Sequence, residues 1–206
     1  MTLVAAMKKN FWTGVLGVAA TALVVGCGGY DTQRDRFGEG NIPVGRVISR
    51  RSAEAAVTIE TDSGVRRTTV TNSGGIFKFD ELPVGGATLT VEPMDPQLER
   101  ESLRIYFGAE QRMIANVGVN DRNIVAVVES LEISMPSGTV VAPGSRTPFV
   151  VRVSGQNVQS LIPSIWVDGG IGSLGAGNQF IASVPGTGKI RVRVLGREAE
   201  LNVTVQ

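Results

Sequence analysis

The sequence has no histidine and only one cysteine, Cys27, among its 206 residues. Without histidine, no side chain has an ordinary pKa suited to general-base catalysis near neutral pH. A Cys–His nucleophile pair, a zinc site of the usual Cys/His type and an intramolecular disulfide are all excluded. An enzyme would have to use Asp/Glu or Ser/Lys chemistry, and no spaced pair stands out among the 19 acidic residues. We therefore expect no catalytic residues, no metal site and no cofactor.

Aromatic residues are also scarce, at 5% of the chain, whereas hydrophobic residues make up 42%. Any core must therefore be mainly aliphatic. The 26 glycines and 9 prolines supply the frequent turns that an all-β chain needs. The charge is nearly balanced, at +1 for the whole chain. This balance gives no basic surface for nucleic acid, which we exclude as a partner.

The N-terminus carries the pattern of an export signal. Lys8 and Lys9 precede an apolar run from Phe11 to Val25. A membrane-spanning helix, the alternative, needs about 20 apolar residues, and this run is shorter. Its length and its positive flank are typical of a signal peptide, which we place at residues 1–26. Removing it leaves 18 basic and 19 acidic side chains, a net charge of −1.

The end of this run, Leu23-Val24-Val25-Gly26-Cys27, resembles the bacterial lipobox. The resemblance implies that Cys27 is lipidated, becomes the new N-terminus and attaches the protein to a membrane through its acyl chains, palmitate among them. A thiolate is a suitable nucleophile for this reaction. Gly28, where inner-membrane lipoproteins of enteric type have Asp, favours the outer membrane. Residues 27–41 are polar and glycine-rich, and we interpret them as a flexible tether.

Residues 42–120 alternate short β-favouring runs with turns about every 8 to 12 residues, which predicts an antiparallel β-sandwich. The expected strands are Val44–Ile48, Ala56–Glu60, Arg67–Thr71, Ile76–Phe79, Ala87–Val91, Leu103–Phe107 and Met113–Val119. Their apolar members should form the core, including Val47, Val57, Ile59, Phe77, Phe79, Leu82, Leu89, Val91, Ile105 and Val117.

This segment resembles the carboxypeptidase regulatory-like domain. The likeness rests on residues 71–79, TNSGGIFKF, followed by Leu82-Pro83-Val84-Gly85. It implies a transthyretin-type sandwich that serves as a structural or interaction module. We expect Gly74 and Gly75 to supply positive φ angles in the turn.

Asn120 to Asn123 interrupt the apolar pattern as a candidate linker, and residues 124–206 predict a second sandwich. Its expected strands are Val128–Ser134, Thr139–Val141, Phe149–Val153, Ser164–Val167, Gln179–Ser183, Lys189–Leu195 and Ala199–Val205. The segment resembles bacterial immunoglobulin-like domains of surface adhesins, in which Trp166 would be a core residue. Gly170-Ile171-Gly172-Ser173-Leu174-Gly175 matches G-x-G-x-x-G, but a strand rather than the required helix is expected after it.

The sequence thus predicts an all-β chain of two tandem antiparallel β-sandwiches behind a signal helix and a tether. We expect a non-enzymatic, lipid-anchored protein of the cell envelope that acts as a structural, adhesion or interaction module. Its partner would be an envelope protein or a polysaccharide. The alternative is a carbohydrate- or solute-binding lipoprotein, with Trp166, Tyr106 or the glycine-rich loop 169–178 at the ligand.

Overall fold

β-Strands dominate the chain wherever the computed structural model describes it, at residues 44–80, 82–108 and 113–206. Those residues form sixteen strands and one short 3-10 helix, and no α-helix occurs among them. The predicted all-β fold class is therefore confirmed. The expected signal peptide and the whole of the tether lie outside the described residues. The described residues all fall within one compact unit, Arg36–Gln206.

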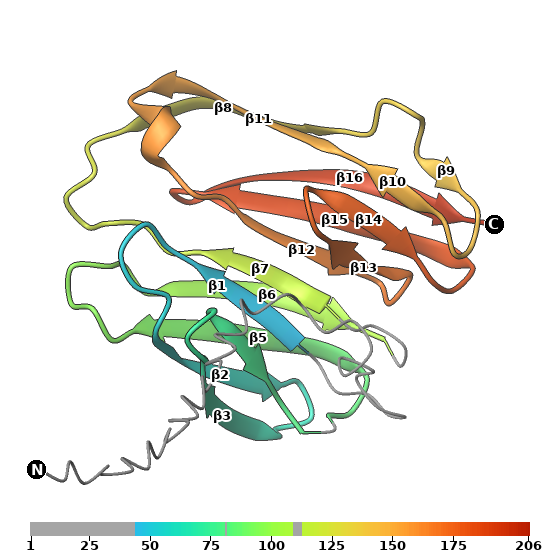
Figure 1. Cartoon of the computed structure of the whole chain (residues 1–206). Helices are drawn as coiled ribbons and strands as arrows, with labels where there is room; N and C mark the ends of the chain where they lie inside the picture. Colours follow the sequence, from blue (N-terminus) through green and yellow to red (C-terminus); the bar gives the residue numbers. More distant parts are fainter. Residues whose placement is uncertain (1–43, 81, 109–112) are drawn as a thin grey trace, which may run out of the picture. The chain divides into compact units, whose positions relative to one another are not determined.

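A four-stranded antiparallel sheet is built entirely from the first half of the chain (Figure 1). Its order is β3-β2-β5-β6. The strands are β2 (Ala55–Thr61), β3 (Arg66–Val70), β5 (Gly85–Pro93) and β6 (Glu101–Phe107). Side chains alternate between the faces, so that Val57 and Ile59 are fully buried while Thr58 and Glu60 point outward.

A seven-stranded sheet contains strands from both halves of the sequence, in the order β4-β1-β7-β12-β15-β16-β9. The strands are β1 (Val44–Ile48), β4 (Ile76–Lys78), β7 (Met113–Gly118), β9 (Val140–Val141), β12 (Ser164–Asp168), β15 (Gly186–Val194) and β16 (Arg197–Val205). The halves meet where β7 pairs with β12, at Ala115 opposite Trp166 and Asn116 opposite Ile165. The linker predicted at residues 120–123 therefore joins two segments that are also connected by backbone pairing.

Two smaller sheets complete the second half. One pairs β8 (Val127–Ser134) with β11 (Val150–Gln156), and the other has the order β10-β14-β13. The latter strands are β10 (Arg146–Pro148), β13 (Gly172–Gly175) and β14 (Gln179–Ala182), and the 3-10 helix η1 covers Val158–Ser160.

Strand β12 contributes to two cores at once. Trp166 belongs to the core of the first half, with Phe107 and Val117, whereas Ile165 and Val167 belong to that of the second half. Alternate residues of a strand point to opposite faces, so the two cores lie against opposite faces of the sheet at β12. A single strand thus stabilises both halves.

All fourteen predicted strands are present, with ends shifted by a few residues. Strands β10 and β13 were not predicted. Two pairs depart from the expected antiparallel pattern, because β1 runs parallel to β7 and β16 parallel to β9. Parallel pairing requires a long connection, and the strands of the four-stranded sheet lie between β1 and β7 in the sequence. In the turn after β3, only Gly75 has a positive φ, of 75°, so the expectation for Gly74 was wrong.

Candidate functional site

The predicted lipidation site, Cys27, lies outside the described residues, as does the whole tether. Lipidation therefore stays a prediction from the sequence. Within the ranges that the structure does describe, no helix has the length and apolar character of a membrane span.

Trp166, one of the two aromatic residues proposed to contact a ligand, is only 1% exposed. It is a core residue, as the sequence favoured, but in the core of the first half rather than that of its own half. Its indole N–H is buried and meets no acceptor in ordinary hydrogen-bond geometry among the described residues. It nevertheless lies close enough to Asp168 to help lower the pKa of that carboxyl. A side chain this buried offers no ring face to a ligand in solution.

Beside Trp166, Asp168 connects the two halves of the chain. Its carboxylate accepts a 2.7 Å hydrogen bond from the backbone N–H of Tyr106 on β6 and lies 3.3 Å from Arg191 on β15. Burial raises the pKa of Asp168 above its ordinary value of 3.8, while the Tyr106 N–H and Arg191 act in the opposite direction. A partly desolvated carboxylate thus binds both a backbone donor and a guanidinium where the two halves meet.

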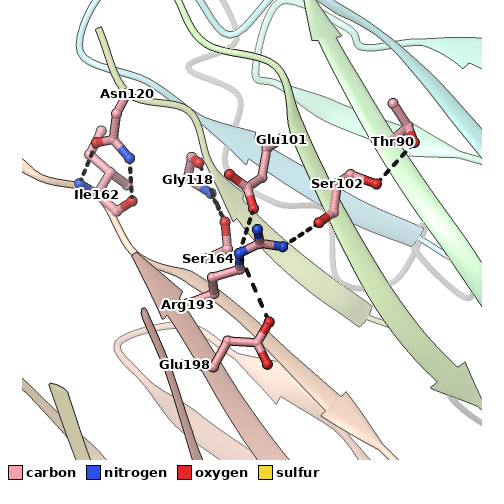
Figure 2. A network of polar contacts seen from close by, with 9 residues as sticks. All are labelled: Thr90, Glu101, Ser102, Gly118, Asn120, Ile162, Ser164, Arg193 and Glu198. Atoms are coloured by element: carbon pink, nitrogen blue, oxygen red, sulfur yellow. Dashed lines mark hydrogen bonds and ion pairs between the residues drawn. The ribbon is translucent and has the colours of Figure 1, made fainter. Parts of the chain in front are cut away.

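Arg193 forms a second connection (Figure 2). Its guanidinium donates a 2.7 Å hydrogen bond to the backbone carbonyl of Ser102 and lies 3.6 Å from Glu101, both on β6. On its other side it lies 3.9 Å from Glu198 of its own half. Burial raises the pKa of Glu101, and the Arg193 charge partly offsets that effect.

Two further contacts involve the ends of β7 and β12 (Figure 2). Ser164 accepts a 3.0 Å hydrogen bond from the Gly118 N–H. The Asn120 amide accepts from the backbone N–H of Ile162 at 2.8 Å and donates to its carbonyl at 3.1 Å. Asn120, the first residue of the predicted linker, is therefore held on both sides of its amide. We call the contacts of Asp168, Arg193, Ser164 and Asn120 the junction.

The exposed face of the four-stranded sheet carries a different arrangement, a row of hydroxyl groups. Thr68, Thr58, Thr90 and Ser102 lie directly opposite one another across β3, β2, β5 and β6. The hydroxyls of Thr58 and Thr68 are 3.0 Å apart, and those of Thr90 and Ser102 are 3.3 Å apart. Each hydroxyl can both donate and accept, so this hydroxyl row can bond to water or to a ligand in either sense.

Charged side chains of both signs flank the hydroxyl row. Glu60 lies opposite Arg66 on one side, and Glu92 lies 3.5 Å from Arg100 on the other. With Thr58, Thr88 and Thr90 these four side chains line a shallow depression of about 110 Å³. Two carboxylates and two guanidiniums leave the depression without net charge.

Tyr106, the other predicted ligand contact, lies on this same outer face of β6 and is 46% exposed. Gly86 is the residue opposite it on β5. The ion pair between Asp62 and Arg104 lies over Gly86, because a Cβ added there would meet both side chains within 3 Å. The Arg104 hydrogen bond lowers the pKa of Asp62. Tyr106 thus lies at the end of the face that carries the hydroxyl row.

The glycine-rich motif at residues 170–175 packs closely against the first half at Gly170 and forms strand β13 from Gly172 to Gly175. Gly170 is in close backbone contact with Gly108 of the first half, since a Cβ on Gly108 would lie 2.7 Å from the Gly170 Cα. Gly172 to Gly175 form β13, so no helix N-terminus is present to bind a phosphate, as expected. The described residues contain no group of three acids or other donors that could hold a metal ion.

Comparison with known proteins identifies no family. No protein-family model matches the chain, and no curated protein is similar enough in sequence to count as a relative. The resemblances to carboxypeptidase regulatory-like and immunoglobulin-like domains therefore stay predictions from short motifs.

Sequence reasoning named Tyr106 as a candidate ligand contact, which stays a prediction, and missed the hydroxyl row and the junction. The hydroxyl pairs of the row join residues 10 and 12 positions apart, and the junction joins residues up to 91 positions apart, which only strand register brings together. The alternation of Thr with buried residues in β2 and β5 was the one available signal, and it did not reveal which strands are neighbours.

Proposed function

We propose that this chain is a non-enzymatic lipoprotein of the bacterial cell envelope, anchored through Cys27, whose β-strand unit acts as a structural, adhesion or interaction module. The sequence supports the anchor through the lipobox-like residues before Cys27. The alternative, binding of a carbohydrate or other solute, is favoured by one observation: the exposed hydroxyl row with Tyr106 on the same face.

The junction is the observation that best supports a role as a structural, adhesion or interaction module. Buried charges are costly unless they are paired. Here Glu101 and Arg193 pair across the two halves, while Asp168 pairs with Arg191 in its own half and accepts the backbone N–H of Tyr106 from the first half. These groups are therefore used in holding the halves together. The surface that is left for a partner is the outer face of the four-stranded sheet and the exposed strand edges, where partners add by backbone pairing.

Membrane attachment is tested by replacing the lipidated residue. The full chain, the Cys27→Ser variant and a control Gly29→Ser variant are expressed in a Gram-negative host with labelled palmitate, and membranes are washed with high salt. We expect wild type and Gly29→Ser to carry label and to sediment with the outer-membrane fraction. Cys27→Ser should do neither, because stable anchoring needs two or more acyl chains. Labelled, membrane-bound Cys27→Ser protein would overturn the anchor.

A further inference from the structure

We propose that the outer face of the four-stranded sheet binds a neutral polysaccharide, with the hydroxyl row as its central contact and Tyr106 at one end. This inference deepens the proposed function, on which its cellular setting rests, by naming the chemistry of the partner. Binding itself does not require the lipid anchor, so the two can fail separately.

The hydroxyl row suits a polyhydroxylated ligand because its groups act as donors and acceptors alike. The Thr58–Thr68 and Thr90–Ser102 hydroxyl pairs can each rearrange to accept or donate one more hydrogen bond to a sugar. Threonine also presents a methyl group, which can pack against the C–H groups of a sugar ring. The row crosses four strands, so the contact surface is extended, as a polymer requires.

Charge argues for a neutral ligand. The depression that Thr58 and Thr90 of the row help to line has two carboxylates, Glu60 and Glu92, balanced by Arg66 and Arg100. Neither an anionic nor a cationic polymer gains net attraction from such a surface. The carboxylates and guanidiniums instead offer acceptors and forked donors, which can bind neighbouring hydroxyl groups of a neutral sugar.

Tyr106 adds an apolar contact on the same face. It is four residues from Ser102 along β6, a separation of about 13 Å. A short oligosaccharide can therefore reach from the depression to the exposed phenol ring. The tyrosine ring combines apolar area with a polar tip, and its exposure leaves it accessible to a ligand of that mixed character.

The experiment uses the full chain in mild detergent, titrated by calorimetry with cellohexaose, chitohexaose and dextran, and with anionic polygalacturonate as a comparison. Thr58→Val and Thr90→Val each remove one hydroxyl while keeping a β-branched side chain of similar shape. Thr204→Val is the matched control, since Thr204 lies on β16, outside the four-stranded sheet. Far-UV circular dichroism checks that each variant is folded.

At least one neutral glycan is expected to bind, with affinity reduced about three- to tenfold by Thr58→Val and Thr90→Val and unchanged by Thr204→Val. Tyr106→Ala should weaken binding as well. The proposal is overturned if no neutral glycan binds, if polygalacturonate is preferred, or if the threonine variants bind as well as the control. Cross-linking of an envelope protein to this face in cells, with no glycan binding, would also overturn it and would leave the lipid anchor unaffected.

Discussion

The backbone N–H of Tyr106 donates a 2.7 Å hydrogen bond to the carboxylate of Asp168, a residue 62 positions later in the chain. The bond joins an edge strand of the four-stranded sheet to the central strand that the two cores share. Trp166, two residues before Asp168, packs into the first core. The two halves are thus connected by a buried aromatic side chain, a desolvated acid and paired backbone within residues 165–168 of one strand.

The pH dependence of stability should reveal the environment of Asp168. Burial raises its pKa above 3.8. A carboxyl whose pKa is higher in the folded state binds more protons there, so the free energy of unfolding falls as the pH rises between the unfolded and folded pKa values. The excess stability of wild type over Asp168→Asn, measured by urea unfolding, should therefore decrease as the pH rises from the ordinary pKa of 3.8 toward the raised pKa of the folded state.

Asp62→Asn is the control, because its effect on stability should depend on pH in the opposite direction. Arg104 lowers the pKa of Asp62, so its contribution is present above the ordinary pKa of 3.8 and is lost as the pH falls toward the lowered value. The difference between wild type and Asp62→Asn should therefore shrink at acid pH. If both variants show the same dependence on pH, the account of Asp168 is wrong.

Close backbone contact between the halves predicts that Gly170 cannot accept a side chain. Its φ is 68°, and a Cβ there would lie 2.8 Å from the Gly108 Cα. Gly177 has nearly the same φ, 67°, but open space around it. Gly170→Ala should therefore lower the free energy of unfolding by about 1–3 kcal/mol more than Gly177→Ala, because strain at φ is common to both and the clash is not. Equal losses in denaturant titrations would show that the contact is unimportant.

Unfolding should be cooperative across both halves. Once the predicted signal is removed, Trp166 is the sole tryptophan, and its buried indole should fluoresce at short wavelength. It comes from the second half yet lies in the first core, so its fluorescence reports on both. We expect fluorescence and far-UV circular dichroism to show one coincident transition in urea, as a two-state unit does. Two separated transitions would mean that the halves unfold independently.

The strands were predictable because apolar residues alternate strictly where one face is buried, as in Val57 and Ile59 or Val203 and Val205. Strand β13 was missed because Gly172 and Gly175 suggest a loop, and β10 because it is a three-residue strand that ends in Pro148. This strand position requires glycine because the side chain of Phe180 and the Ile181 carbonyl leave no room for a Cβ on Gly172.

The pairing of β7 with β12 could not be predicted, since it depends on which edges of the two halves face each other. The junction and the hydroxyl row could not be predicted for the same reason, because both depend on which strands are neighbours. Tyr106 was identified only as a rare aromatic residue, and its exposed position on the sheet face came from the structure.

The central claim, attachment through a lipidated cysteine, is tested most directly by mass spectrometry of the N-terminal peptide of the protein from host membranes. The account predicts that the chain begins at Cys27 and that this residue carries the mass of a diacylglyceryl group with its acyl chains. A chain that retains residues 1–26 with an unmodified Cys27 thiol, recovered from the soluble fraction, would contradict it.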